Sequence, residues 1–475
     1  MTRKQKILPT LKDVLITGVG AEGKAIARDG EMVIFVSFGA PGDVADIKLL
    51  KKKSNYAEGK IVAVNTPSPV RETPFCNHFS ICGGCRWQHL RYDEQLKSKA
   101  SQVEDSLRRI GKVEIGEIRP IIASSLTQRY RNKLEYTFTS SRWLTEDELA
   151  DVEIADRNGL GFHIPGRFDK VLDIHNCYLQ DDISNRIRIA IKNYCLSHDG
   201  YDFFDLRSQQ GFMRNLIIRN SATTGELMII LVFAADDRVK RDALLDFISG
   251  KFEEITSIFF VINTKCNDNI ADLEAHLFKG NEYITERMDN LFFRICPKSF
   301  YQTNSLQAYQ LYKVVRDFAS LEGHETIYDL YTGAGTIACF LADKASRVIG
   351  IEYVEQAVED ARANAALNNI GNATFFSGDM KDILTEGFIA EQGYPDVIVT
   401  DPPRAGMHTD VIKAILFSAP ARIVYVSCNP ATQARDLALL AVDYEVCKIQ
   451  PVDMFPHTHH VENVALLIRR TFNEA

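Results

Sequence analysis

The sequence predicts a multidomain α/β protein with an N-terminal OB-like β-barrel, a central α+β domain and a C-terminal Rossmann-like domain. Its 475 residues suffice for about two to four domains, each with its own core. Short apolar segments separated by turn residues fill the N-terminal region, as in a small barrel. Near the C-terminus apolar strands alternate with helical patterns, which predicts a parallel sheet covered by helices. We place the three domains at residues 1–66, 67–300 and 301–475.

Short strands predict the barrel. Their apolar residues alternate with polar ones, and glycine-containing turns separate them. The Pro-rich stretch 66–69 that follows is typical of a linker between domains. The predicted strands span residues 14–16, 32–36, 44–50 and 59–64.

Beyond the linker, apolar spacing predicts a helix over residues 92–110. Residues 118–286 are mixed in pattern and rich in strands. From residue 305 strand and helix patterns alternate to the end of the chain, which predicts a doubly wound sheet. Its clearest strands span residues 326–330, 347–351, 396–400 and 422–426, with a helix over 335–345.

The composition excludes several classes of protein. With 45% hydrophobic and 25% charged residues, the chain is neither disordered nor fibrous. No segment has the roughly 18–20 apolar residues of a membrane span, and no apolar signal core follows the basic N-terminus. A cytoplasmic location is therefore expected, where thiols stay reduced and the 10 cysteines serve as ligands, nucleophiles or core residues.

Charge is distributed unevenly along the chain. The net charge is −8, yet residues 1–131 contain 22 Lys and Arg against 14 Asp and Glu. This asymmetry favours contact between the N-terminal part and a polyanion, although a solvated surface explains it equally well.

A glycine-rich turn suggests a nucleotide-like ligand. Gly333 and Gly335 stand where a strand passes into a helix, and Glu352 ends the next strand about 20 residues on, where a carboxylate accepts ribose hydroxyls. A dinucleotide fingerprint would have glycine at position 338, which is Ala338. Further acidic residues close later strands and would repel a pyrophosphate but not a sulfonium. We therefore favour S-adenosylmethionine; the additional acidic residues are Asp379 and Asp401.

Two C-terminal segments contain reactive side chains. Cys428 follows an apolar strand and precedes an Asn-Pro turn, so it faces the same edge as the acidic residues unless it is a buried core residue. Residues 455–462 combine His457, His459 and His460 with Glu462, which also allows a polar loop or a metal site.

A thiol and a carboxylate beside a methyl donor suggest methylation of a pyrimidine at carbon 5. That carbon is too weakly nucleophilic until a thiolate adds to carbon 6, and a base must later remove the carbon-5 proton. Cys428 and Glu462 are the required types of group, with His457 or His459 as a proton relay or a support for Glu462. Asp401 suits a hydrogen bond to the ring or to the donor.

Three motifs give the chain a resemblance to a known family: Asp-Pro-Pro-Arg-Ala-Gly at 401–406, Ser-Cys-Asn-Pro at 427–430 and His-Thr-x-His-Val-Glu at 457–462. The chain resembles, over essentially its whole length, the RNA 5-methyluridine methyltransferases, which modify uridine in 23S ribosomal RNA or transfer RNA. The resemblance implies that Cys428 is the nucleophile and Glu462 the base. It also implies donor contacts through Gln302, Tyr331, Glu352, Asp379 and Asp401.

A second cluster of cysteines lies near the N-terminus. Cys76, Cys82 and Cys85 have the spacing C-x5-C-x2-C, and Cys177 follows at a distance. Four thiolates hold either zinc or an iron–sulfur cluster, and the single C-x2-C pair favours the cluster. The resemblance implies a 4Fe–4S cluster bound by these four cysteines, with a structural role or a role in shaping the RNA surface, since methyl transfer needs no redox step.

The resemblance also makes the barrel a TRAM domain, an RNA-binding module. The stretch 129–133 surrounds Tyr130 with three cations, which suits phosphate contact and base stacking. A uridine in folded RNA must swing out to reach Cys428, and Phe300 or Phe455 suits the vacated place.

The sequence also bears on which RNA is the substrate and on two other classes of function. The barrel and the cysteines favour 23S ribosomal RNA over transfer RNA, because the transfer-RNA enzymes of the family generally lack both. A methyltransferase acting on an exocyclic amine would need no thiol, and a non-catalytic RNA-binding iron–sulfur protein would need neither Cys428 nor Glu462. We expect a monomer without an obligate protein partner.

Overall fold

A computed structural model describes residues 8–149 and 156–471 and opens with a closed five-stranded barrel in the order β1-β2-β3-β5-β4. Closure leaves the small sheet without free edges. Its interior is filled by alternating apolar residues such as Ile16, Ile34 and Ile47. The predicted barrel is thus confirmed, with strands β1 (Thr10–Val19), β2 (Ala25–Asp29), β3 (Met32–Ser37), β4 (Val44–Lys52) and β5 (Tyr56–Thr66).

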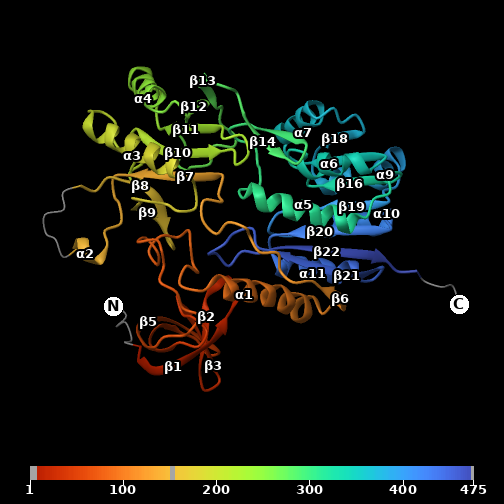
Figure 1. Cartoon of the computed structure of the whole chain (residues 1–475), viewed down its shortest axis with the longest axis horizontal. Coiled ribbons are helices and arrows are strands. Elements are labelled where there is room, and N and C mark those ends of the chain that lie inside the picture. The colour runs from red at the N-terminus through yellow and green to blue at the C-terminus, as the bar shows by residue number, and fades with distance from the viewer. Residues whose placement is uncertain (1–7, 150–155, 472–475) are drawn as a thin grey trace, which may run out of the picture.

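After the cysteine-containing segment, the chain runs beneath the C-terminal domain (Figure 1). Helix α1 (Tyr92–Asp105) continues into a π-helical turn, Ser106–Gly111, which confirms the predicted helix over 92–110. Strand β6 (Ile115–Ile118) then pairs in parallel with β21 (Tyr444–Val452) of the C-terminal sheet. Residues from the first quarter of the predicted central domain therefore complete the edge of the C-terminal sheet.

The central domain is built on a seven-stranded mixed sheet in the order β13-β12-β11-β10-β7-β8-β9. Helices α3 (Asp182–Ser197) and α4 (Arg238–Lys251) lie against it (Figure 1). The short helix α2 (Glu146–Leu149) precedes β8. The strands are β7 (Lys133–Thr139), β8 (Gly159–Ile164), β9 (Arg167–Asp173), β10 (Met213–Asn220), β11 (Leu227–Phe233), β12 (Ser257–Ile262) and β13 (His276–Gly280), followed by the separate hairpin β14 (Ile284–Met288) and β15 (Leu291–Ile295).

The C-terminal domain has an eight-stranded sheet in the order β18-β17-β16-β19-β20-β22-β21-β6. Five of its strands are parallel, as predicted, but β22 is antiparallel to both of its neighbours. The predicted alternation therefore stops before the end of the chain, because β21 returns as β22 through the loop 453–461 without a helix. The other strands are β16 (Thr326–Leu330), β17 (Arg347–Glu352), β18 (Ala373–Ser377), β19 (Val397–Thr400), β20 (Arg422–Ser427) and β22 (Glu462–Arg469).

Helices cover this sheet. Within residues 8–149 and 156–471, no helix combines the length and the apolar character that crossing a membrane requires. The helices of the C-terminal domain are α5 (Ser305–Ala319), α6 (Thr336–Leu341), α7 (Glu355–Leu367), α8 (Met380–Ile383), α9 (Glu386–Gln392), α10 (Thr409–Ser418) and α11 (Pro430–Leu440).

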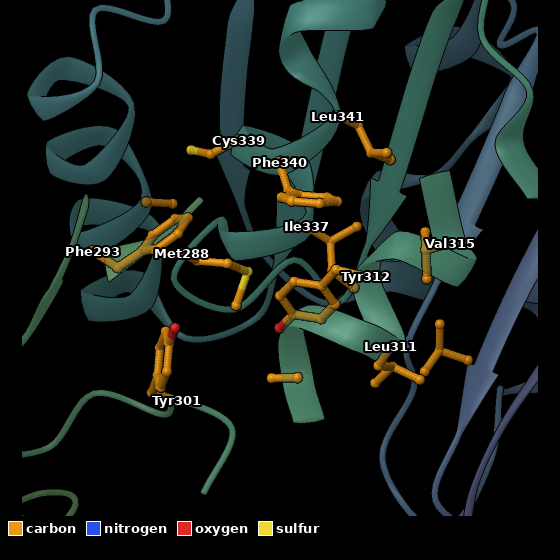
Figure 2. Packing of buried hydrophobic residues seen from close by; sticks show 14 of the residues in the cluster. Met288, Phe293, Tyr301, Leu311, Tyr312, Val315, Ile337, Cys339, Phe340 and Leu341 are labelled. Atoms are coloured by element: carbon orange, nitrogen blue, oxygen red, sulfur yellow. The ribbon is translucent and has the colours of Figure 1, made fainter. Parts of the chain in front are cut away.

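One apolar core joins the β14–β15 hairpin to helices α5 and α6 (Figure 2). Phe293 of the hairpin and Phe340 of α6 are almost completely buried in it. At its polar margin, the Tyr312 hydroxyl lies 3.0 Å from the Thr336 Oγ1, in hydrogen-bonding contact. This contact fixes the start of α6, and with it the glycine-rich turn that precedes the helix.

Candidate active site

Five of the predicted site residues lie at one edge of the C-terminal sheet. Tyr331 follows β16, Glu352 ends β17, Asp379 follows β18, Asp401 follows β19 and Cys428 follows β20. Because these strands are parallel, their carboxyl ends meet at the same edge, where open α/β sheets bind ligands.

The glycine-rich turn after β16 has a backbone that only small residues adopt readily. Gly335 has φ 74°, and a Cβ atom there would lie 2.9 Å from the Cβ of Ala361. Glu352 holds this turn, since its Oε2 accepts a hydrogen bond of 3.0 Å from the Gly333 N–H. Its Oε1 accepts one of 2.9 Å from the Val354 N–H. The carboxylate of Glu352 is thus oriented beside the turn.

Asp329 is a structural residue of the turn that the sequence motifs did not single out. Its Oδ2 accepts hydrogen bonds from Thr332 Oγ1 at 2.5 Å and from the Ala338 N–H at 3.1 Å. Burial raises the pKa of Asp329 to about 7, with Glu352 adding to the effect. An acidic residue four positions before the first glycine of a Gly-x-Gly turn was the signal available in the sequence.

Asp379 and Gln302 differ in their surroundings. Asp379 caps the short helix α8 and lies 3.1 Å from Lys381 Nζ, which lowers the pKa of its carboxyl group. Gln302 is buried, and its carbonyl accepts a hydrogen bond of 2.9 Å from Asn132 Nδ2. The loop that contains Gln302 is therefore anchored to the stretch 129–133.

That stretch is partly structural. Tyr130 is buried, and its hydroxyl donates to the Pro456 carbonyl at 3.1 Å, so its ring is unavailable for the expected base stacking. Asn132 is buried as well. Arg131 lies with its guanidinium 5.8 Å from the centre of the Phe455 ring, a cation–π distance.

Around Cys428, three ionisable side chains influence one another. Burial raises the pKa of Glu462 to about 8, and the neighbouring Asp401 adds to this effect. Burial and Asp329 raise the pKa of Asp401 to about 7. The pKa of Cys428 rises to about 11, first through burial and then through the negative charges of Glu462 and Asp401. Cys428 and Glu462, predicted to act together, therefore lie in one electrostatically coupled site.

Arg404 opposes these shifts. The positive charge of its side chain lowers the pKa of both Cys428 and Glu462. Its carbonyl accepts hydrogen bonds from Asn429 Nδ2 at 3.0 Å and from Thr432 Oγ1 at 3.1 Å. Arg404 therefore favours the ionised form of the Cys428 thiol. The Asp-Pro-Pro-Arg motif contains this residue, but the motif alone indicated no role for it in the chemistry.

Local contacts position Cys428. Ser427 Oγ accepts a hydrogen bond of 3.1 Å from the Asn429 N–H. Asn429 caps helix α11 through a 3.1 Å hydrogen bond from the Ala431 N–H to its Oδ1, and Pro430 occupies the first turn. This turn holds the thiol at the end of β20.

The three histidines of the loop 453–461 are held in the neutral form. Burial lowers the pKa of His457 and His459 to about 4 and that of His460 to about 3. His457 Nδ1 lies 3.2 Å from Gln95 Nε2 of helix α1.

Across residues 8–149 and 156–471, no group of three or more His, Cys, Asp or Glu side chains is arranged to hold a metal ion.

A cavity of about 800 Å³ lies between the cysteine segment and the loops that contain Arg404 and Phe455. Arg404, Phe455, Thr458 and His460 line one side of it, together with Phe300. Phe300 is 69% exposed, so its ring is accessible to a bound base. The four predicted ligand thiols line the same cavity; they belong to Cys76, Cys82, Cys85 and Cys177.

Comparison with known families matches two parts of the chain. Residues 10–62 match the TRAM domain, which is the segment that forms the barrel. Residues 271–470 match the family described as tRNA (Uracil-5-)-methyltransferase, which covers the C-terminal domain and the β14–β15 hairpin.

Whole-chain relatives extend these matches. An uncharacterized RNA methyltransferase of Porphyromonas gingivalis is 58% identical over 464 residues, 96% of this chain and 99% of that protein. One from Bacteroides thetaiotaomicron is 58% identical over 453 residues, 94% of this chain and 99% of that protein. The crystal structure of the Pyrococcus abyssi tRNA (uracil-54, C5)-methyltransferase, in complex with S-adenosyl-L-homocysteine, superposes with a TM-score of 0.74 at 30% identity. It covers 96% of this chain and 100% of that one.

Proposed function

The chain belongs to the S-adenosylmethionine-dependent RNA (uracil-5-)-methyltransferases with a TRAM domain, and we propose that it forms 5-methyluridine in 23S ribosomal RNA through Cys428 and Glu462. One observation supports this assignment of residues most strongly. The thiol, the buried carboxylate and Arg404 influence one another at the sheet edge that also holds the glycine-rich turn.

The proposed reaction begins at the thiol. The Cys428 thiolate, stabilised by Arg404, forms a bond from Sγ to carbon 6 of the uracil, and the electrons of the 5,6 double bond move to the O4 enolate. Carbon 5 then attacks the donor's methyl group, the sulfonium–methyl bond breaks and S-adenosylhomocysteine leaves. No other oxidant or reductant is needed.

Glu462 completes the cycle. Its carboxylate takes the carbon-5 proton, the double bond forms again and the bond between Sγ and carbon 6 breaks, which releases the thiolate. The pKa of about 8 suits Glu462 to this step, because a stronger base at pH 7–8 takes a proton from carbon more readily. Asp401 keeps this pKa high by its own negative charge.

The methyl donor is proposed to bind along the acidic edge. Tyr331, Glu352, Asp379 and Asp401 lie in the loops at this edge, and the Gln302 loop is anchored nearby through Asn132. Negative groups there favour a cationic sulfonium ligand. The hydrogen-bonded orientation of Glu352 beside Gly333 supports its predicted contact with the ribose hydroxyls.

We further propose that Cys76, Cys82, Cys85 and Cys177 bind a 4Fe–4S cluster. The four thiols line one cavity, and burial raises the pKa of Cys82 and Cys85 to about 12, so an occupant of positive charge is needed to keep them ionised. Such a cluster would supply a rigid, sulfur-ligated junction between the cysteine segment and the central domain.

Polar atoms without partners support this fit. Among the described residues, His163 Nδ1 is buried without a hydrogen-bond partner, and the Tyr136 hydroxyl and Arg188 Nε, whose side chains lie against each other, have no further partner. His163 lines the cavity, and the ionisation of both Tyr136 and Arg188 is influenced by Cys177. Donors of this kind suit the sulfide and thiolate sulfur atoms of such a cluster.

The cluster is tested by its content of metal. Protein purified without oxygen is expected to contain iron and acid-labile sulfide in about equal amounts, and Cys82→Ser should lose both. Zinc without sulfide would replace this proposal with the tetrahedral alternative. Protein with neither metal would overturn it.

Transfer RNA is the second candidate substrate, because one specific observation favours it. The Pyrococcus abyssi enzyme, named for tRNA position 54, matches 96% of this chain, a span that includes the barrel. Ribosomal RNA remains the proposal on the combination of the barrel with four cavity-lining cysteines.

The substrate is tested by incubating the protein with S-adenosylmethionine and, separately, with 23S ribosomal RNA and transfer RNA lacking 5-methyluridine. Mass spectrometry of nuclease fragments then locates the methyl group. A methylated uridine in one 23S fragment supports the proposal, and a second fragment indicates two sites. Product only in transfer RNA transfers the assignment to the second candidate.

A further inference from the structure

The loop 453–461, which leads directly into Glu462, is held by a helix more than 350 positions earlier in the chain. Lys99 Nζ donates to Asp453 Oδ1 at 2.5 Å and to the Phe455 carbonyl at 3.0 Å. The Tyr92 hydroxyl donates to Asp453 Oδ2 at 2.7 Å. The side chains of Lys99 and Asp453 are both 0% exposed. An ion pair inside the protein thus joins α1 to the first residue of the loop.

A second contact holds the middle of the loop. Gln95 Oε1 accepts a hydrogen bond of 2.8 Å from the His457 N–H. Gln95 Nε2 donates to the carbonyls of Trp87 and Leu90 at 3.0 and 2.9 Å. Gln95 therefore connects the loop to the segment that follows the cysteines, and every polar atom of its amide is used.

The backbone of the cysteine segment meets the same point. The His457 carbonyl accepts hydrogen bonds from the N–H groups of Arg86 and Trp87 at 2.8 and 3.0 Å. His457 has φ 63°, a left-handed conformation that a side chain adopts rarely and that its surroundings must hold. The path of the loop is thus held largely from outside the C-terminal domain, with one contact from inside it, since Asn304 Nδ2 donates to the Met454 carbonyl at 3.0 Å.

This loop borders the large cavity and leads directly into Glu462. Phe455, Thr458 and His460 line the cavity, and Glu462 follows as the first residue of β22. A general base must come within about 2.6–3.2 Å of the proton that it removes. A displacement of about 1 Å can reduce a rate by about 100-fold. Small shifts of the loop are therefore expected to affect proton removal.

We propose that Gln95 and Lys99 are positioning residues for Glu462, acting on the step that removes the carbon-5 proton. Cys428, held by its own turn between β20 and α11, does not depend on them. Attack at carbon 6 therefore proceeds, while resolution of the covalent adduct slows. The inference rests on the proposed function of Cys428 and Glu462 and extends the reacting unit into the N-terminal part of the chain.

The ion pair gives this role more weight than a role in stability. A buried ion pair gains little over an apolar pair of similar size, because both charges lose their hydration. An apolar pair, however, would leave the Phe455 carbonyl without the hydrogen bond from Lys99. The main effect of the ion pair between Lys99 and Asp453 is therefore to fix the position of the loop.

The test uses the full chain with Gln95→Met and Lys99→Met. Matched controls on the same helix are Gln102→Met and Lys97→Met, of which the Lys97 side chain is 68% exposed. Each variant is mixed with S-adenosylmethionine and the RNA found to be methylated by the wild type. The fraction of protein covalently joined to RNA is read on denaturing gels over time, beside the rate of product formation. Glu462→Gln provides the reference for a blocked final step.

In Gln95→Met and Lys99→Met, product formation is expected to fall at least about tenfold while the adduct fraction rises several-fold towards that of Glu462→Gln. The two controls should keep the wild-type ratio of adduct to product. A protein that is merely less stable would lose adduct and product in equal proportion, and that result would overturn the inference.

Two further outcomes are separable. If Lys99→Met fails to fold because Asp453 loses its partner, the double variant Lys99→Met/Asp453→Leu removes both charges and should still accumulate adduct. If Glu462→Gln itself forms no adduct, the proposed mechanism fails. If Glu462→Gln accumulates the covalent adduct but Gln95→Met and the double variant do not, the proposed mechanism stands and the positioning role of Gln95 and Lys99 is wrong.

Discussion

The two proposed catalytic side chains are positioned in opposite ways. Cys428 is held by neighbours one to three positions away, namely Ser427, Asn429 and the start of α11. The loop before Glu462 is held by Gln95 and Lys99, 362 and 354 positions distant from their partners. The position of the nucleophile thus depends on one strand and one turn, with Arg404 from the loop after β19 acting on its ionisation, whereas the base requires two distant parts of the chain to fold together.

This difference explains the arrangement of the molecule. Helix α1 and strand β6 lie against the C-terminal sheet, with the barrel beyond α1 (Figure 1). The cysteine segment and helix α1, which follow the barrel in the chain, therefore hold the loop 453–461. In the proposed mechanism the base therefore depends on a structural element outside the C-terminal domain, while the position of Cys428 is local to β20 and the turn after it.

Removing the nucleophile should break the local side of the comparison with the largest effect. Cys428→Ala is expected to reduce methyl transfer by at least about 1,000-fold, because carbon 5 is not activated without addition at carbon 6. Binding of S-adenosylmethionine, followed by calorimetry, should stay within about twofold of the wild type. Activity that persists in this variant would show that another group adds to the ring.

Removing Arg404 tests how the thiolate is stabilised. In Arg404→Gln the pKa of Cys428 loses the influence that opposes burial, so adduct formation is expected to slow by about 100-fold near pH 7.5. Raising the pH should recover part of the rate, because a larger fraction of the Cys428 thiol is then ionised even without the positive charge of Arg404. A pH-independent deficit would instead point to a contact between Arg404 and the RNA.

The base predicts a pH profile of moderate size. Glu462 must be ionised to accept a proton, and its pKa is about 8, so resolution of the adduct should accelerate about tenfold per pH unit below 8 and level off above it. Single-turnover experiments with rapid quenching between pH 6 and 9 measure this step. A profile that is flat from pH 6 would mean that Glu462 is already ionised there.

The smallest effect concerns stability. The folded-state pKa of Glu462 is raised, so its contribution to stability is complete below the ordinary carboxyl pKa and is lost as the pH rises through about 8. Glu462→Gln stays neutral and should therefore melt about 1–2 °C above the wild type at pH 8.5, with no such gain at pH 4.5. Calorimetry at the two pH values provides the comparison, and equal differences at both would contradict the shifted pKa.

Local signals in the sequence predicted most of the local structure. The turn chemistry around Gly333 and Gly335 and the apolar strand before Cys428 predicted that the turn and the thiol lie at one edge of the sheet, as they do. The barrel followed from short alternating strands, and its match to TRAM agrees. These features depend on residues that are close in sequence, where propensity and spacing are informative.

Long-range contacts were not predicted. Nothing in residues 92–118 indicates that α1 anchors a loop near residue 457 or that β6 extends the C-terminal sheet. The antiparallel return of β22 was missed because an apolar strand reads alike in either direction. Tyr130 was read as an exposed ring, yet its hydroxyl is paired inside the protein with the Pro456 carbonyl. Burial against distant segments leaves no local trace.

The most direct measurement of the central claim is the covalent complex itself. Glu462→Gln is incubated with S-adenosylmethionine and RNA lacking 5-methyluridine, and the adduct is digested and mapped by mass spectrometry. A methylated uridine joined to the peptide that contains Cys428, absent from the double variant Cys428→Ala/Glu462→Gln, is the predicted result. No adduct, or an adduct at another residue, would contradict the assignment of Cys428 as nucleophile and Glu462 as base.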